Sequence, residues 1–254
     1  MQLEIRCREM GLAAKLLPWY RRARRQLPWR AVGKAPDPYR VWLSELMLQQ
    51  TRVEAVVPYF VRFIERFPDV RRLAAATEPE VLAHWAGLGY YSRARALHRA
   101  ARIVVDERNG RFPEDVESWM TLPGVGRYTA GAIVSIAFGK PAPILDGNVA
   151  RVLTRLYGLR GDPRSAPLNR ELWSLASRIL PRRSISDFNQ ALMELGALIC
   201  APRSPRCLVC PLRQECVARR EGLQHRLPEL RARAKTTPVL MGAAVVEENG
   251  RILF

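Results

Sequence analysis

The sequence predicts an all-α fold followed by the beginning of a β-containing segment. Apolar residues recur at helical spacing as far as about residue 227, and almost no stretch before that point alternates as a strand does. Capping residues, prolines and glycines divide this region into segments of helix length. Adjacent β-branched residues flanking a turn signal gather in only one place, residues 238–254.

Helix-start and helix-stop signals give the expected elements. Asp37-Pro38 is a strong start, because aspartate caps the first turn and proline suits the first helical position. The segment 87–90 contains two glycines and is read as a turn. We expect helices over 12–26, 39–50, 53–67, 73–85, 92–107, 113–120, 127–138, 149–157, 168–180 and 185–199.

The last residues follow a different pattern. Residues 238–246 read as a strand, residues 247–250 as a turn with an Asn-Gly hairpin signal, and residues 251–254 as the start of a second strand. Two strands are not stable alone, so we expect the chain to stop inside a second, β-containing domain. Residues 221–237 would be the linker to it.

The composition favours a polyanionic partner. The chain has 254 residues and a formal net charge of +17, and 37 of its 41 basic residues are arginine. DNA phosphates attract such an excess, although an anionic membrane would too, and an arginine bias can reflect genome composition. Residues 1–15 lack the apolar run of a signal peptide, and no apolar stretch approaches the roughly 20 residues of a membrane span. We expect a cytoplasmic protein without membrane contact.

Four cysteines gather in a short segment. Cys200, Cys207, Cys210 and Cys216 are separated by six, two and five residues. In a reducing compartment this spacing indicates a metal centre, and zinc sites usually contain two C-x2-C pairs where this chain has one. We therefore favour a 4Fe–4S cluster, with zinc as the alternative. The intervening loop would present Arg203 and Arg206 to DNA phosphates.

A glycine-containing turn joins two predicted helices. It consists of Leu122 and Pro123 followed by Gly124, Val125 and Gly126. The glycines allow a tight turn and a close backbone approach, and the N–H groups that open the next helix attract anions. The turn is suited to a DNA phosphate, though a bare Gly-x-Gly is more often an ordinary connection.

Two carboxylates occupy unusual positions. Glu45 stands in an apolar helical run, where burial would raise its pKa and keep it protonated near neutral pH. Asp146 stands at a loop–helix junction, where it could cap the helix. Carboxylates with separated pKa values serve glycoside hydrolysis, in which one protonates the leaving group and the other stabilises the cation. On the residues alone, a structural role is as good an interpretation of either acid.

Taken together, these motifs resemble the helix–hairpin–helix DNA glycosylases that carry a C-terminal iron–sulfur cluster. The resemblance extends from about residue 17 to residue 211 and includes LPWR at 27–30, DPYRVWLSELMLQQTRV at 37–53 and GLGYYSRARAL at 87–97. It continues through LPGVGRYTAGAI at 122–133, ILDGNVARVLTRLYG at 144–158 and FNQALMELGALIC at 188–200. It implies a two-lobed fold, with a six-helix lobe over 30–140 and a cluster lobe formed by 1–29 and 141–220.

Three features favour the adenine-specific branch of that superfamily over the endonuclease III branch. The adenine branch has a glutamate in the SE-x-M-L-Q-Q-T motif, which corresponds to Glu45. The endonuclease III branch has a Schiff-base lysine two residues after the second hairpin glycine, where this chain has Tyr128. A Nudix-like domain follows the cluster in the adenine branch, and residues 238–254 resemble its beginning.

The resemblance implies a role for individual residues. Glu45 would protonate adenine N7, Asp146 would stabilise the sugar cation, and Tyr128 and Asn148 would support the site. Gln50, Leu88 and Tyr90 would enter the DNA stack where the adenine is flipped out. Trp29, Arg30 and Gln190 would line the pocket for the extruded base, and Gln49 would contact the DNA or the base. The expected partner is duplex DNA with adenine opposite 8-oxoguanine or guanine, bound by a monomer at the nucleoid. The alternatives are an endonuclease III-like glycosylase and AP lyase for oxidised pyrimidines, or a non-enzymatic iron–sulfur redox sensor that binds DNA.

Overall fold

The structure is a computed structural model that describes residues 2–30, 36–231, 242, 245–248 and 251–253. Up to residue 231 its regular structure is helical, which confirms the all-α prediction for this part of the chain. The α-helices are α1 Gln2–Ala23, α2 Pro38–Leu48, α3 Val53–Arg66, α4 Val70–Ala75, α5 Glu78–Trp85, α6 Tyr91–Arg108, α7 Val116–Met120, α8 Arg127–Phe138, α9 Gly147–Tyr157, α10 Ala166–Arg178, α11 Ile185–Leu198 and α12 Val217–Arg220.

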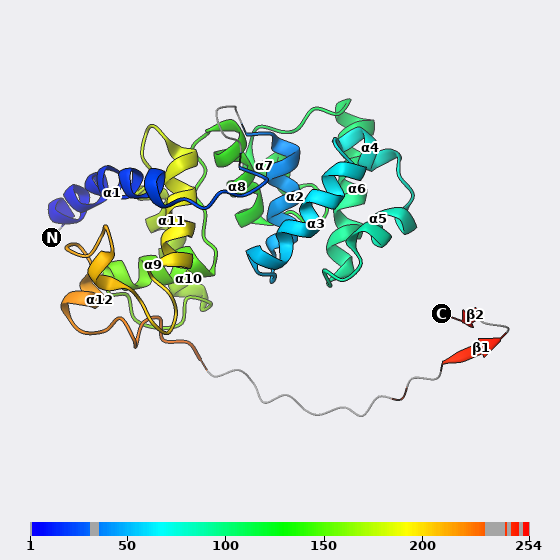
Figure 1. Ribbon diagram of the computed structural model, residues 1–254. Helices are drawn as coiled ribbons and strands as arrows, with labels where there is room; N and C mark the ends of the chain where they lie inside the picture. The colour runs from blue at the N-terminus through cyan, green and yellow to red at the C-terminus, as the bar shows by residue number, and fades with distance from the viewer. Residues whose placement is uncertain (1, 31–35, 232–241, 243–244, 249–250, 254) are drawn as a thin grey trace.

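The helices form two neighbouring groups (Figure 1). Helices α2 to α8 lie on one side, and α9 to α12 lie on the other together with α1, which packs against α11. The two groups meet where α8 packs against α11. This arrangement agrees with a two-lobed fold; the residue boundaries of the lobes stay a prediction. None of the helices in the described residues is long and apolar enough to cross a membrane.

Capping side chains set several of the helix starts. Asp37 accepts a hydrogen bond from the backbone N–H of Tyr39 and begins α2 with Pro38, as the sequence predicts. The single helix expected over 73–85 is wrong, because the chain forms α4 and α5 there. Thr77 caps α5 through the N–H of Glu80, and a proline in the first turn prevents α4 from continuing. The helix expected from residue 113 begins at Val116, after the N-cap Asp115.

A buried aromatic cluster fixes α2. Trp42 packs edge-on against Trp119, with ring centroids 5.7 Å apart, and Phe112 stacks on Trp119 at 5.6 Å. Both tryptophan side chains are fully buried. Because such a contact leaves little freedom to slide, α2 holds its remaining side chains in fixed positions.

The chain after α12 packs back onto the α9–α10 region. Leu223 and Leu227 form a small core with Ala218. Arg155 donates from Nε to the backbone carbonyl of Leu227 at 2.8 Å, and the backbone N–H of Arg231 donates to Asp162 at 3.1 Å. The first part of the expected linker is therefore bound to the helical body, and residues 232–237 lie outside the described residues.

The hairpin expected in the last residues is present, with a correction. Strands β1 Val246–Glu248 and β2 Arg251–Leu253 pair antiparallel, with Val246 opposite Leu253. Glu247 and Glu248 belong to the strand and not, as predicted, to the turn, because they pair with Ile252 and Arg251. Most of the segment 238–245 lies outside the described residues, and its assignment to a Nudix-like domain stays a prediction.

Candidate active site

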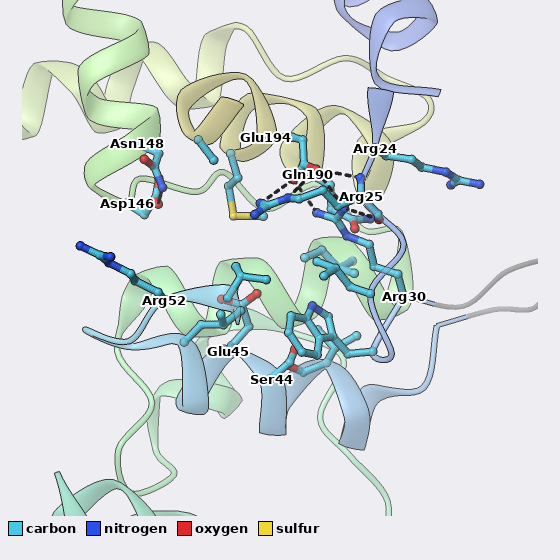
Figure 2. A pocket seen from close by; sticks show the side chains of 18 of the residues that line it. Arg24, Arg25, Arg30, Ser44, Glu45, Arg52, Asp146, Asn148, Gln190 and Glu194 are labelled. Carbon is cyan, nitrogen blue, oxygen red and sulfur yellow. Dashed lines mark hydrogen bonds and ion pairs between the residues drawn. The ribbon is translucent and has the colours of Figure 1, made fainter. Parts of the chain in front are cut away.

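A large pocket opens where the two groups of helices meet. Its volume is about 1140 Å³, and its walls come from the end of α1, the segment 24–30, α2, the turn 49–54, the start of α8, residues 146–148 and α11. Figure 2 shows Glu45 on the α2 side of the pocket and Asp146 on the α9 side. Of the sequence-predicted residues, the structure brings together here Glu45, Tyr128, Asp146, Asn148, Trp29, Arg30, Gln49, Gln50 and Gln190.

Glu45 is a buried acid with a single side-chain hydrogen bond recorded in the described residues. Its side chain is 7% exposed, and the hydroxyl of Tyr128 donates to its Oε2 at 2.8 Å. Burial raises the pKa of Glu45 to about 7, and the nearby charge of Asp146 adds to this rise. The hydrogen bond from Tyr128 and the charge of Arg30 oppose it. This carboxyl is therefore partly protonated near neutral pH, as the sequence pattern predicted.

Tyr128 holds Glu45 from α8. Burial and the negative charge of Glu45 raise the pKa of the Tyr128 phenol well above its usual value, so it stays neutral and can donate. The same hydroxyl lies 3.2 Å from the sulfur of Met193 on α11. Tyr128 thus connects α2, α8 and α11 in the wall of the pocket.

Asp146 is the N-cap of α9, which confirms the predicted capping role of this residue. Its Oδ1 accepts the backbone N–H of Val149 at 2.7 Å, and its Oδ2 accepts the side-chain amide of Asn148 at 3.0 Å. Burial raises its pKa, while these hydrogen bonds oppose the rise. The cap does not exclude a chemical role, because the carboxylate also faces the pocket.

Asn148 is itself held from outside the pocket. Arg151 donates to its Oδ1 at 2.7 Å and to the carbonyls of Gly196 and Cys200, each at 2.8 Å. Helix α11 approaches closely here, since a Cβ added to Gly196 would lie 2.7 Å from the Cβ of Asn148. The orientation of Asp146 therefore depends on the packing of α9 against α11.

The predicted base-pocket residues line the same cavity. Trp29 is buried and packs edge-on against Phe60 at 5.2 Å, so it forms a rigid apolar wall. Gln190 is 9% exposed and donates to the hydroxyl of Ser186 at 3.2 Å. These groups offer one flat apolar surface and amide polar atoms, which suits a planar heterocycle.

Two turns carry the residues expected to enter the DNA stack, and one of them, residues 49–54, lines the pocket. Gln50 and Tyr90 are exposed, and both have positive φ angles, 58° and 51°. Gln49 lies behind Gln50 and donates to the hydroxyl of Thr129 at 3.4 Å. Leu88 is only 7% exposed in this structure, so of the expected wedge residues Tyr90 and Gln50 are the accessible ones.

The hairpin turn has the tight geometry that its glycines suggest. Gly124 has a φ of 78°, and a Cβ added there would lie 2.8 Å from the Cβ of Ala96. Val125 is buried, and Gly126 is the N-cap of α8. The free N–H groups of α8 thus begin directly after this turn.

The four cysteines lie in the loops that follow α11. All four are free thiols and half-buried, and Arg155 donates to the sulfur of Cys200 at 3.4 Å. Burial raises the pKa of Cys210 to about 12, and the charges of Cys200, Cys216 and Cys207 add to the rise. Among the described residues, no three histidine, cysteine or acidic side chains are placed to bind one metal ion. Arg203 and Arg206 are exposed on the loop between the first two cysteines.

The comparison with known families adds a decisive observation. Residues 43–178 match the family described as HhH-GPD superfamily base excision DNA repair protein, and they make up more than half of the chain. The chain belongs to the HhH-GPD superfamily. The match contains Glu45, the hairpin, Tyr128, Asp146 and Asn148.

Several curated relatives of this HhH-GPD protein carry the name adenine DNA glycosylase. It is 47% identical to human adenine DNA glycosylase over 84% of this chain and 40% of the relative. It is 42% identical to the adenine DNA glycosylase of Buchnera aphidicola subsp. Schizaphis graminum, over 81% of this chain and 59% of the relative. The chain thus spans about half the length of the curated relatives it matches.

Solved structures share the HhH-GPD fold. A thermostable thymine-DNA glycosylase superposes with a TM-score of 0.75 and 30% identity, over 84% of this chain and 97% of that one. A trapped covalent intermediate of endonuclease III with DNA superposes with a TM-score of 0.70 and 25% identity, over 88% of this chain and 99% of that one.

The wall of the pocket also contains an ion cluster that the sequence analysis did not predict. Glu194 is 1% exposed and accepts from Arg25 and Arg30, each at 3.0 Å, as the dashed lines in Figure 2 show. Burial alone would raise the pKa of Glu194, but the hydrogen bonds from Arg25 and Arg30 lower it to about 2. The signal was present, because Glu194, like Glu45, is an acid within an apolar helical run.

Proposed function

We propose that this protein is a DNA glycosylase that hydrolyses the N-glycosidic bond of adenine opposite 8-oxoguanine or guanine. The observation that carries the proposal is a buried carboxyl, Glu45, with a pKa raised to about 7, in one pocket with a second carboxylate, Asp146. The names of the curated relatives support adenine as the base.

The first step would be protonation of the leaving base. Glu45 is partly protonated at neutral pH and transfers its proton to adenine N7, which makes the base a better leaving group. The bond between C1′ and N9 then breaks, and its electron pair stays with adenine. Tyr128 keeps the Glu45 carboxyl oriented, and its hydrogen bond stabilises the carboxylate that remains.

The second step would be stabilisation and capture of the sugar cation. The carboxylate of Asp146 is held by Asn148 and by the α9 backbone. Its negative charge would stabilise the positive charge that develops at C1′. Water adds its oxygen to C1′, and the ionised Glu45 accepts the proton that water loses. Both acids thereby return to their starting states.

The pocket favours hydrolysis over a lyase reaction. A lyase needs an amine to attack C1′ and form an imine, and the described pocket walls contain no lysine. Lys15 and Lys140 are paired with Glu215 and Glu114 elsewhere on the surface. We therefore infer that the DNA strand stays intact after base release.

DNA would bind across the pocket mouth. Gln50, Tyr90 and the buried Leu88 belong to two turns that would face the gap left in the stack by the extruded adenine. The hairpin 124–126 would bind a phosphate, as would Arg203 and Arg206. The net charge of +17 supports binding to chromosomal DNA, and we infer a monomer acting at the nucleoid.

We also propose that Cys200, Cys207, Cys210 and Cys216 hold a 4Fe–4S cluster. The donor set fits, because all four thiols are free, half-buried and close enough to influence one another's pKa, and Arg155 offsets negative charge beside Cys200. A cluster is ligated at four corners, so its sulfurs lie farther apart than those around one ion. The bound cluster would supply a fixed loop geometry. The purified protein should contain about four irons per chain; stoichiometric zinc without iron would contradict the assignment.

A cleavage assay tests the proposed function. Duplexes with adenine opposite 8-oxoguanine, guanine or thymine are incubated with the protein and analysed with and without hot alkali. We expect alkali-dependent cleavage at the mispaired adenine and none opposite thymine. Strand nicking without alkali at the rate of base release would indicate a lyase, and no cleavage in any duplex would indicate a binding protein.

A further inference from the structure

Arg93 is a buried cation for which the described residues provide only neutral hydrogen-bond acceptors. It lies in the first turn of α6 and is 8% exposed. Nη1 donates to the carbonyls of Leu46 at 2.9 Å, Met47 at 3.0 Å and Gln49, all at the end of α2. A buried charge is costly, so its presence requires these acceptors to be well placed.

The second terminal nitrogen of the same guanidinium, Nη2, reaches a second turn, whereas Nε has no hydrogen-bond partner among the described residues. Nη2 donates to the carbonyls of Gly89 at 3.2 Å and Leu88 at 3.4 Å, and to the hydroxyl of Thr51 at 3.4 Å. The guanidinium also lies 5.1 Å from the ring centroid of Tyr90. One rigid, planar group therefore bonds both the turn after α2 and the turn before α6.

Each of these turns contains an exposed residue in a strained conformation. Gln50 has a φ of 58° and Tyr90 a φ of 51°, values that side-chain-bearing residues rarely adopt. Such conformations persist where the surrounding structure enforces them. Arg93 supplies that enforcement on both sides, because it binds the carbonyls of Gln49 and Gly89, the neighbours of the two strained residues.

We infer that Arg93 is a positioning residue that couples the two turns, so that Gln50 and Tyr90 enter the DNA stack as one rigid wedge when the base is extruded. This inference rests on the proposed function and adds a step to it. Extrusion should depend on Arg93, whereas phosphate binding and the chemistry at Glu45 should depend on it much less. Arg93 touches neither the base nor the sugar in this scheme.

The variant Arg93→Met keeps the apolar part of the side chain and removes the guanidinium group. The variant Arg93→Lys keeps the charge without the planar geometry. Arg95→Met is the matched control, because Arg95 lies on the same helix, is exposed and forms one ion pair with Glu78. Thermal melting first establishes that each variant is folded. Hydrogen exchange of the wild type adds a measurement without substitution, in which residues 49–51 and 88–90 should gain protection together on DNA binding.

The readout is the fluorescence of 2-aminopurine in place of the target adenine opposite guanine, which rises when the base leaves the stack. Arg93→Met should reduce this rise about tenfold, consistent with the loss of charged hydrogen bonds, while DNA affinity changes less than about threefold. Arg93→Lys should fall between it and the wild type. Adenine release should slow about tenfold from a mispair and clearly less from adenine opposite an abasic site.

The inference would be overturned by an unchanged fluorescence rise in folded Arg93→Met, or by independent protection of the two turns in the wild type. An equal loss of release from both substrates would also overturn it, because it would assign Arg93 to the chemistry. If the wild type releases no adenine, the proposed function fails. The coupling still stands if the fluorescence rises in the wild type and falls in Arg93→Met as expected.

Discussion

Replacement of Glu45 by glutamine should make the protein inactive and more stable at the same time. The pKa of Glu45 rises from 4.5 to about 7, chiefly through burial. At about 1.36 kcal/mol per pH unit, the ionised carboxylate costs the folded state about 3 kcal/mol. Glutamine carries no charge, and its carbonyl can still accept the hydrogen bond from Tyr128.

The pH dependence of this stabilisation follows from the direction of the shift. Because the folded-state pKa lies above the unfolded one, wild-type stability falls as pH rises from about 4.5 to about 7, and the penalty is complete above that range. The glutamine variant should exceed the wild type by about 3 kcal/mol near pH 8.5 and by less than about 1 kcal/mol near pH 5. For a chain of this size, 3 kcal/mol corresponds to roughly 6–12 °C in melting temperature.

Thermal melting at both pH values measures the effect, with Glu171→Gln as the control, because Glu171 is exposed on α10. Adenine release by Glu45→Gln should fall at least about 100-fold, since the general acid is lost. Equal melting temperatures of wild type and variant at the higher pH would refute the predicted cost of burying the ionised carboxylate. Activity within about threefold of wild type would refute the acid role.

Three further substitutions test the surroundings of Glu45. Tyr128→Phe removes the hydrogen bond that lowers the pKa of Glu45, so the alkaline limb of the pH–rate profile should move up by about 0.5–1 unit; a downward shift would contradict this. Gly196→Ala should displace Asn148 and slow adenine release about tenfold or more, whereas Gly11→Ala, which has open space around it, should leave the rate unchanged. Equal rates of adenine release by Gly196→Ala and Gly11→Ala would show that α11 does not orient the site. Tyr128→Lys places an amine next to Glu45 and should produce a borohydride-trapped DNA adduct; a folded variant that binds DNA without an adduct would place residue 128 away from C1′.

Features with local causes were predicted well from the sequence. The helix expected over 127–138 matches α8 at both ends, because Gly126 precedes it and Gly139 ends it in the left-handed conformation. Asp146 was correctly predicted as an N-cap for the same kind of reason. Conversely, the break between α4 and α5 was missed although Thr77 and a proline mark it, because the apolar spacing continues across it.

Features with tertiary causes could not be predicted in the same way. Glu194 lies 169 and 164 positions from Arg25 and Arg30, so no local pattern shows that the three side chains meet. Arg93 reads as one more charge on a basic helix, and its six acceptors become visible only when α2 and α6 are placed together. The burial of Leu88 in the free protein is likewise a result of packing.

In the proposed mechanism, the buried Glu45 donates the proton that releases adenine. The most direct measurement is the pH dependence of kcat/KM for adenine release from an A:8-oxoguanine duplex, which reports groups of the free enzyme. We predict an alkaline limb with a midpoint near 7, the pKa to which burial raises this carboxyl. A rate that stays constant or rises from pH 6 to about pH 9 would contradict the account, because ionised Glu45 has no proton to donate.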